Sequence, residues 1–127
     1  MGSRDPAVDH FLELMAPMGD AAARRLFGGW GLYLDALIIA LFADGVVYMK
    51  ADALTRDAFE AAGSVPFVFH GKGRAIATSY WSLPEAALDS PEALQPWVQL
   101  ALQAARRKAP AKRKPARGRK GPRTGLS

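Results

Sequence analysis

Apolar residues recur at helical spacing near the N-terminus of the chain. They lie three or four positions apart until Gly19 ends the pattern: Val8, Phe11, Leu12, Met15 and Met18. Asp5 and Pro6 stand directly before them, which is the order of a helix N-cap and a first-turn proline. The pattern therefore predicts an amphipathic first helix.

A second helical stripe lies toward the C-terminal end. Ser90 and Pro91 repeat the start signal, and Glu92 suits the positive end of a helix dipole. The apolar positions that follow form one face: Leu94, Trp97, Val98, Ala101 and Ala105. We expect this last helix to run into Arg106 and Arg107.

Between the two helices the apolar pattern becomes that of strands. Residues 30–34 alternate between large apolar residues and Gly31 or Tyr33, and residues 37–42 form a continuous apolar run. The "ADG" turn at 43–45 connects that run to residues 46–50. Three antiparallel strands in a meander are predicted.

The next part of the chain predicts a short helix and two more strands. The helix passes through Phe59 to Ala62, with Asp52 or Thr55 as its cap and Gly63 at its end. Residues 67–70 and 76–81 then flank a glycine-rich turn at 71–74. The predicted fold is α+β: a mostly antiparallel sheet of about five strands, packed with N-terminal, middle and C-terminal helices.

Charge divides the chain into two parts. Residues 1–105 hold seven basic and all twelve acidic residues, a net charge of −5, whereas residues 106–127 hold ten basic and no acidic residues, a net charge of +10. The basic segment is rich in proline and glycine, and Leu126 is its single large apolar residue. We expect a folded domain over 1–105 and a tail over 106–127 that is disordered beyond about Arg107.

Composition also limits the classes of protein to which this chain could belong. The longest wholly apolar run, residues 36–43, is far shorter than the roughly 20 residues that cross a bilayer, so no membrane association is expected. The N-terminus lacks an apolar signal core, which predicts a cytoplasmic protein. Because the chain has no cysteine, disulfides, thiolate zinc sites and cysteine nucleophiles are excluded.

Catalytic residue types are sparse. His10 and His70 are the two histidines, and each is better explained as a surface side chain than as a base or a metal ligand. Most carboxylates fall in helix caps and first turns, where the helix dipole explains them. We expect no catalytic residues, no metal and no cofactor.

The segment "RRLFGGWGLYLD", residues 24–35, has the glycine content of a phosphate-binding loop. Such a loop would open a helix, whereas this one leads into the strand pattern. The glycines are therefore predicted to turn the backbone between the first helix and the sheet. Arg24 and Arg25 either form a solvated or ion-paired face or belong to an anion-binding surface, and Lys50 is either a functional cation or an ordinary exposed lysine.

Together these segments resemble the TfoX (Sxy) N-terminal domain family, from roughly Asp5 to Ala105. The matching positions are Arg25, Phe27, Gly28, Gly29, Gly31, Tyr33, Lys50, Phe59, Gly63, Phe67, Tyr80, Pro84 and Trp97. The resemblance implies the family's fold, mainly structural roles for these residues, and a bacterial regulator of competence and transcription. Two departures stand out: Leu26 replaces a frequent Met, and the basic tail stands where full-length regulators have a domain similar to helix-hairpin-helix DNA-binding units.

The basic tail is the candidate nucleic-acid-binding segment. Its cations are Arg106, Arg107, Lys108, Lys112, Arg113, Lys114, Arg117, Arg119, Lys120 and Arg123. A flexible arm of this kind binds phosphates without reading sequence, although RNA, an anionic lipid surface or an acidic protein would also attract it. The predicted function is a noncatalytic regulatory or interaction module with nonspecific nucleic-acid affinity. The alternative is a stand-alone protein-interaction or homodimeric scaffold domain that pairs through a strand edge and binds no nucleic acid.

Overall fold

A computed structural model describes residues 5–26, 28–71 and 73–113 of the chain. The helices, including the 3-10 helices η1 and η2, are α1 (Pro6–Met15), η1 (Ala16–Met18), α2 (Arg56–Ala61), η2 (Glu85–Asp89) and α3 (Pro91–Arg113). The strands are β1 (Ala21–Leu26), β2 (Gly29–Leu34), β3 (Leu37–Ala43), β4 (Val46–Lys50), β5 (Pro66–Gly71) and β6 (Arg74–Ser82). The described strands form one antiparallel sheet in the order β1-β2-β3-β4-β6-β5.

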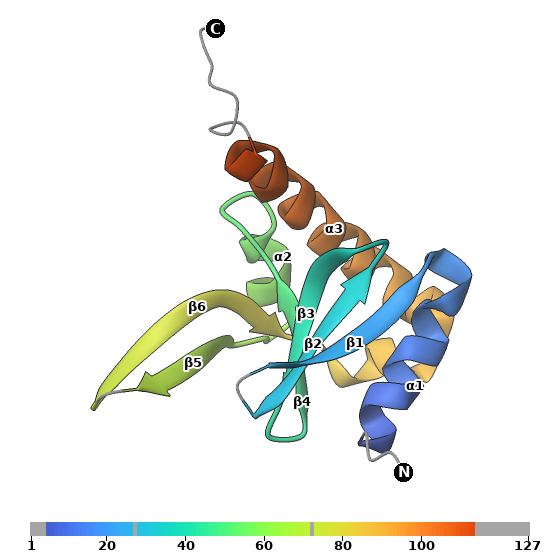
Figure 1. The fold of residues 1–127 in the computed structure, drawn as a ribbon, viewed down its shortest axis with the longest axis horizontal. Coiled ribbons are helices and arrows are strands. Elements are labelled where there is room, and N and C mark those ends of the chain that lie inside the picture. The colour runs from blue at the N-terminus through green and yellow to red at the C-terminus, as the bar shows by residue number, and fades with distance from the viewer. Residues whose placement is uncertain (1–4, 27, 72, 114–127) are drawn as a thin grey trace, which may run out of the picture.

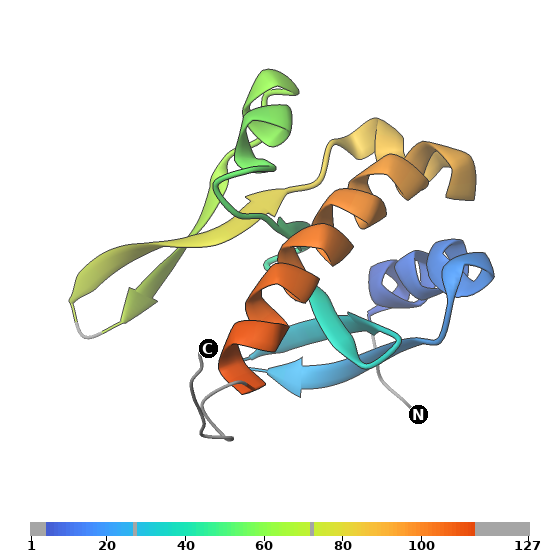
Figure 2. The same ribbon diagram turned by 90° about the horizontal axis from the view of Figure 1, so that it is seen from above.

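The predicted α+β class is confirmed, with helices at the N-terminal, middle and C-terminal positions. Helices α1 and α3 pack against each other and against strands β1 to β4, whereas α2 contacts β6 (Figure 1). The β5–β6 hairpin projects away from the rest of the domain in both ribbon views (Figures 1 and 2). The strand order makes β5 one edge strand of the sheet and β1 the other.

The core lies between the sheet and the two long helices. Its largest fully buried side chains are Phe11, Phe59, Met15, Leu32, Leu34, Ile39, Met49, Leu94, Val8 and Val98. The stripes predicted for the first and last helices supply several of them, so both amphipathic faces are used as the periodicity indicates.

Both predicted helix starts are confirmed. The Asp5 carboxylate accepts a hydrogen bond from the backbone N–H of Ala7 at 2.8 Å, and the Ser90 hydroxyl accepts one from Ala93 at 3.0 Å. These bonds satisfy N–H groups that have no partner inside the helix. Helix α2 also lies where it was expected, and Gly63 follows it with a φ of 85°.

Strand β1 was not predicted. Its sequence, AAARRL, contains residues that favour helices, and its exposure does not follow a simple alternation. The strand forms because it pairs along its whole length with β2, from Ala21 opposite Leu34 to Leu26 opposite Gly29. Tertiary pairing therefore overrides local propensity, and the sheet gains a sixth strand.

The last helix extends beyond the point at which disorder is expected, and the prediction of a disordered tail stays a prediction. Helix α3 continues to Arg113 and so crosses the expected domain boundary at residue 105. Alanine, lysine and arginine favour helices. The remaining tail positions 114–127 lie outside the described residues.

Candidate functional site

The glycine-rich segment forms a turn between two strands. Gly28 has a φ of 82° and joins β1 to β2, so the expected turn between the first helix and the sheet is wrong in its location. At Gly29 a Cβ atom would collide with the backbone carbonyl oxygen of Phe42 on the neighbouring strand β3. Gly28 therefore turns the backbone with a positive φ, as predicted, and Gly29 allows strands β2 and β3 to approach closely.

Arg24 and Arg25 lie on strand β1 and stack on aromatic rings of β2. The Arg24 guanidinium lies 5.3 Å from the centre of the Tyr33 ring, and that of Arg25 lies 5.0 Å from the Trp30 ring. Both arginines are exposed. The rings hold the two guanidinium groups in place and leave their N–H groups accessible to anions.

Other positions of the resemblance have structural roles. Pro84 is the N-cap residue of η2, and Gly31 lies in β2 opposite Arg24. Trp97 on α3 packs against the Phe59 ring of α2, with ring centroids 5.0 Å apart. Phe27 lies outside the described residues.

Three further positions of the resemblance, Tyr33, Lys50 and Tyr80, meet at one surface pocket of about 440 Å³, which we call the Lys50 pocket. Strands β2, β3, β4 and β6 and helix α3 contribute to its wall. The lining residues are Tyr33, Ala36, Leu37, Ile38, Lys50, Ser79, Tyr80, Ala105 and Lys108. Two lysines and no carboxylate occur among these described lining residues.

Lys50 is buried, with 8% of its surface exposed, so the expectation of an ordinary exposed lysine is wrong. The residue ends β4, where it pairs with Tyr80 of β6. Its ammonium group donates a hydrogen bond to the Tyr80 hydroxyl at 3.3 Å and lies 4.9 Å from the centre of the Tyr80 ring. Antiparallel pairing thus places the cation and the phenol side by side.

Burial raises the pKa of the Tyr80 hydroxyl, and the neighbouring Tyr33 contributes in the same direction. The phenol therefore keeps its proton at neutral pH. Because its oxygen accepts the hydrogen bond from Lys50, its own proton is left to donate to another group.

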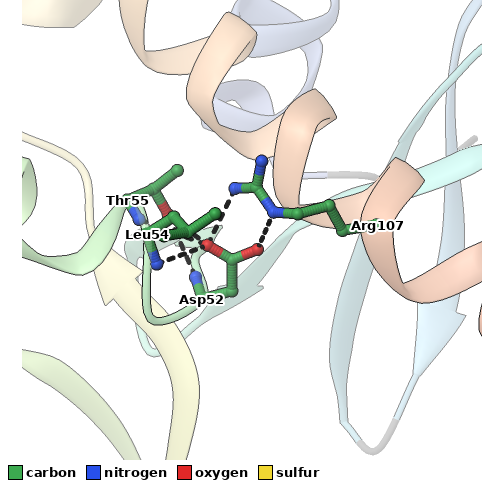
Figure 3. A network of polar contacts seen from close by, with 4 residues as sticks. All are labelled: Asp52, Leu54, Thr55 and Arg107. Carbon is green, nitrogen blue, oxygen red and sulfur yellow. Dashed lines mark hydrogen bonds and ion pairs between the residues drawn. The ribbon is translucent and has the colours of Figure 1, made fainter.

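Beside the pocket, Asp52 binds Arg107 of helix α3 (Figure 3). Arg107 donates from Nε to Oδ2 at 2.6 Å and from Nη2 to Oδ1 at 2.9 Å. Oδ1 also accepts from the backbone N–H groups of Leu54 and Thr55. The Arg107 guanidinium, with smaller contributions from these amides, lowers the pKa of Asp52 to about 2. Partial burial acts in the opposite direction and raises this pKa.

Some of the predicted nucleic-acid-binding residues lie on helix α3, and the others lie outside the described residues. Arg106, Arg107 and Lys108 are exposed on α3, and the Arg107 guanidinium is engaged by Asp52. Helix α3 carries Lys112 and Arg113 in its last turn. The remaining predicted residues lie outside the described part of the chain: Lys114, Arg117, Arg119, Lys120 and Arg123.

The two histidines are separate in the fold. His10 on α1 makes a hydrogen bond with the carbonyl oxygen of Leu88 at 3.1 Å, and His70 lies exposed on β5. Within residues 5–26, 28–71 and 73–113, no group of three or more His, Asp or Glu side chains is placed to hold a metal ion. No helix in the same residues is long and apolar enough to cross a membrane.

Sequence reasoning singled out Lys50, Tyr33 and Tyr80 as separate positions and did not bring them together. Lys108 appeared there as one cation of the tail. The register of β4 with β6, in which Lys50 lies opposite Tyr80, is the structural signal that unites them. It depends on a pairing between strands that are separated by α2 and β5 in the chain, which local patterns do not reveal.

Comparison with known proteins agrees with the observed architecture. The chain matches none of the curated protein sequences with which it was compared. The family model of the TfoX N-terminal domain matches residues 13–105, which include nearly all of the described domain. The chain therefore belongs to the TfoX N-terminal domain family.

Proposed function

We propose that this chain is a noncatalytic regulatory or interaction module whose basic C-terminal segment binds nucleic acid. The separation of charge carries the proposal, because residues 106–127 have a net charge of +10 and residues 1–105 a net charge of −5. Membership of the TfoX N-terminal domain family supports a regulatory role, with competence as the process that the resemblance suggests.

The exposed cations at the described end of α3 support the proposal. Arg106 and Lys108 are exposed, and Asp52 anchors the helix through Arg107 between them. The acidic domain repels a phosphate backbone, whereas the cations of residues 106–127 attract it. Contacts of this kind are made to phosphates, so they hold the protein on nucleic acid without selecting a base sequence.

The salt dependence of duplex-DNA binding by the full chain tests this proposal. If about five cations neutralise phosphates, the logarithm of the affinity should fall with the logarithm of salt concentration at a slope of about −4 to −5. Fluorescence anisotropy of a labelled duplex measures this slope directly. Failure to bind any duplex at low salt would contradict the proposal.

A second candidate function is self-association through strand β5. This edge strand carries exposed apolar side chains, with Val68 37% and Phe69 44% exposed, and Val65 directly before it is 58% exposed. A second copy of the chain pairing with this edge would cover these side chains and extend the sheet. A dimer that persists at high salt in light scattering, and is lost in Val68→Lys, is the expected result for this function.

A further inference from the structure

The Lys50 pocket has features of a small-molecule site that the charge of the tail does not explain. Its volume of about 440 Å³ lies within the range of about 300–1,000 Å³ that is typical of ligand sites. Residues from four strands and one helix form its wall. A site made from several packed elements has a defined shape, unlike a row of surface cations.

The buried position of Lys50 is the first observation. An ammonium group that has lost most of its water interacts with an anion more strongly than an exposed one does, because the surrounding dielectric constant is lower. With 8% of its surface exposed, Lys50 meets this condition while its residue still lines the pocket. Its bond to Tyr80 fixes the direction of the side chain.

Hydroxyl groups supply further donors beside the ammonium group. Tyr80 accepts from Lys50 and keeps a proton that it can donate, while Tyr33 adds a second phenol hydroxyl to the wall. An oxyanion with several oxygens can accept from such groups at the same time. A phosphate has the number of acceptors and the geometry for this, whereas a single carboxylate has fewer oxygens.

The second cation comes from helix α3. Lys108 is exposed at the pocket, and the neighbouring Arg107 fixes this part of α3 by its two hydrogen bonds to Asp52. Figure 3 shows this link between the loop after β4 and the helix. The wall thus contains two lysines, side chains of the type that bind phosphate groups.

Apolar surface completes the pocket. Leu37, Ile38 and Ala105 lie in the same wall as the two tyrosine rings. We propose that the Lys50 pocket binds a small phosphate monoester, with the phosphate at Lys50, Tyr80 and Lys108 and the organic part against the apolar wall. This inference goes beyond the proposed nucleic-acid binding, which rests on the charge of residues 106–127 as a whole.

Titration of the full chain with phenyl phosphate, followed by two-dimensional amide NMR, tests the proposal. We expect saturable shifts of amides in residues 33–38, 50 and 79–80, and little response to inorganic phosphate at the same concentration. Lys108→Ala should weaken binding about tenfold, because it removes a charged partner, and Tyr80→Phe about threefold to tenfold, because it removes one hydroxyl. Arg74→Ala removes an exposed charge on the β5–β6 hairpin and should leave binding unchanged.

Two results would overturn the proposal. One is the absence of saturable shifts at these amides up to about 10 mM phenyl phosphate, a concentration that would reveal even weak binding. The other is equal affinity in the parent chain, Lys108→Ala and Tyr80→Phe. A chain with Arg117, Arg119 and Lys120 changed to Gln should still bind phenyl phosphate even when its DNA binding is reduced. Failure of the pocket proposal is therefore distinguishable from failure of the nucleic-acid proposal.

Discussion

Arg107 and Asp52 join helix α3 to the loop after strand β4, with Nε to Oδ2 at 2.6 Å and Nη2 to Oδ1 at 2.9 Å (Figure 3). The two residues are 55 positions apart in the sequence, and side-chain exposures of 39% and 29% leave the pair in contact with solvent. A bidentate pair of this kind holds the orientation of a helix more strongly than a single contact would. It makes Arg107 a structural residue as well as part of the basic segment.

Replacement of Arg107 by Ala should therefore lower the melting temperature by about 2–5 °C, a modest loss because solvent screens the pair. Arg106→Ala removes the same charge from the adjacent exposed position and should change the melting temperature less. Differential scanning calorimetry of the two variants gives the comparison. Equal melting temperatures for both variants would show that the pair does not stabilise the domain.

The same pair predicts a dependence of stability on pH. The pKa of Asp52 is lowered from 3.8 to about 2, chiefly by Arg107, so folding favours the ionised carboxylate. The stabilisation is therefore complete above pH 3.8 and is lost as the pH falls toward about 2. The stability difference between the parent chain and Arg107→Ala, measured by urea unfolding, should shrink over this range. A difference that stays constant over this range would contradict the assignment.

Substitutions at the β1–β2 turn should distinguish two effects of glycine. Gly29→Ala places a Cβ against the Phe42 carbonyl oxygen and should cost about 2–4 kcal/mol, because the adjoining strands must shift. Gly28→Ala meets open space and should cost about 1–2 kcal/mol for the positive φ alone. Urea unfolding of both variants measures the costs, and a smaller loss at Gly29 than at Gly28 would contradict the packing argument.

The middle helix is held to the domain by Phe59. This side chain is fully buried and contacts the Trp97 ring of α3, so Phe59→Ala should lower the free energy of unfolding by about 3–5 kcal/mol. Leu54→Ala serves as the control, because Leu54 is 76% exposed and its truncation should cost less than about 0.5 kcal/mol. Similar losses in the two variants would indicate that α2 is not packed as described.

The sequence predicted elements whose signals are local. Helix starts at Asp5 and Ser90 follow from short side chains that cap N–H groups, and β3 follows from an uninterrupted apolar run. Strand β1 is not predicted by the sequence because Ala and Arg favour helices. Its residues form a strand because they pair with β2. The Lys50 pocket could not be predicted from local patterns, because it combines residues from five elements. The register and packing of these elements are set by the whole fold.

The basic segment was recognised from charge alone, and its first residues belong to helix α3. Proline and glycine indicate disorder, whereas α3 extends to Arg113 and contacts Asp52 through Arg107. The ion pair is not visible in the sequence because Asp52 is equally suited to cap helix α2. A single carboxylate here contacts both the loop after β4 and helix α3.

The most direct test of the central claim compares DNA affinity in two matched full-length variants. One changes Arg117, Arg119 and Lys120 to Gln, and the other changes Arg56, Lys72 and Arg74 to Gln, so both lose three positive charges. Fluorescence anisotropy across a salt series measures the slope of log affinity against log salt concentration for each variant. The slope of the first variant should be shallower than that of the parent chain by about 2.7, because three phosphate contacts are lost. The slope of the second variant should be nearly unchanged. Equal slopes in the two variants, or no duplex binding by the parent chain at low salt, would contradict the claim that the C-terminal segment binds nucleic acid.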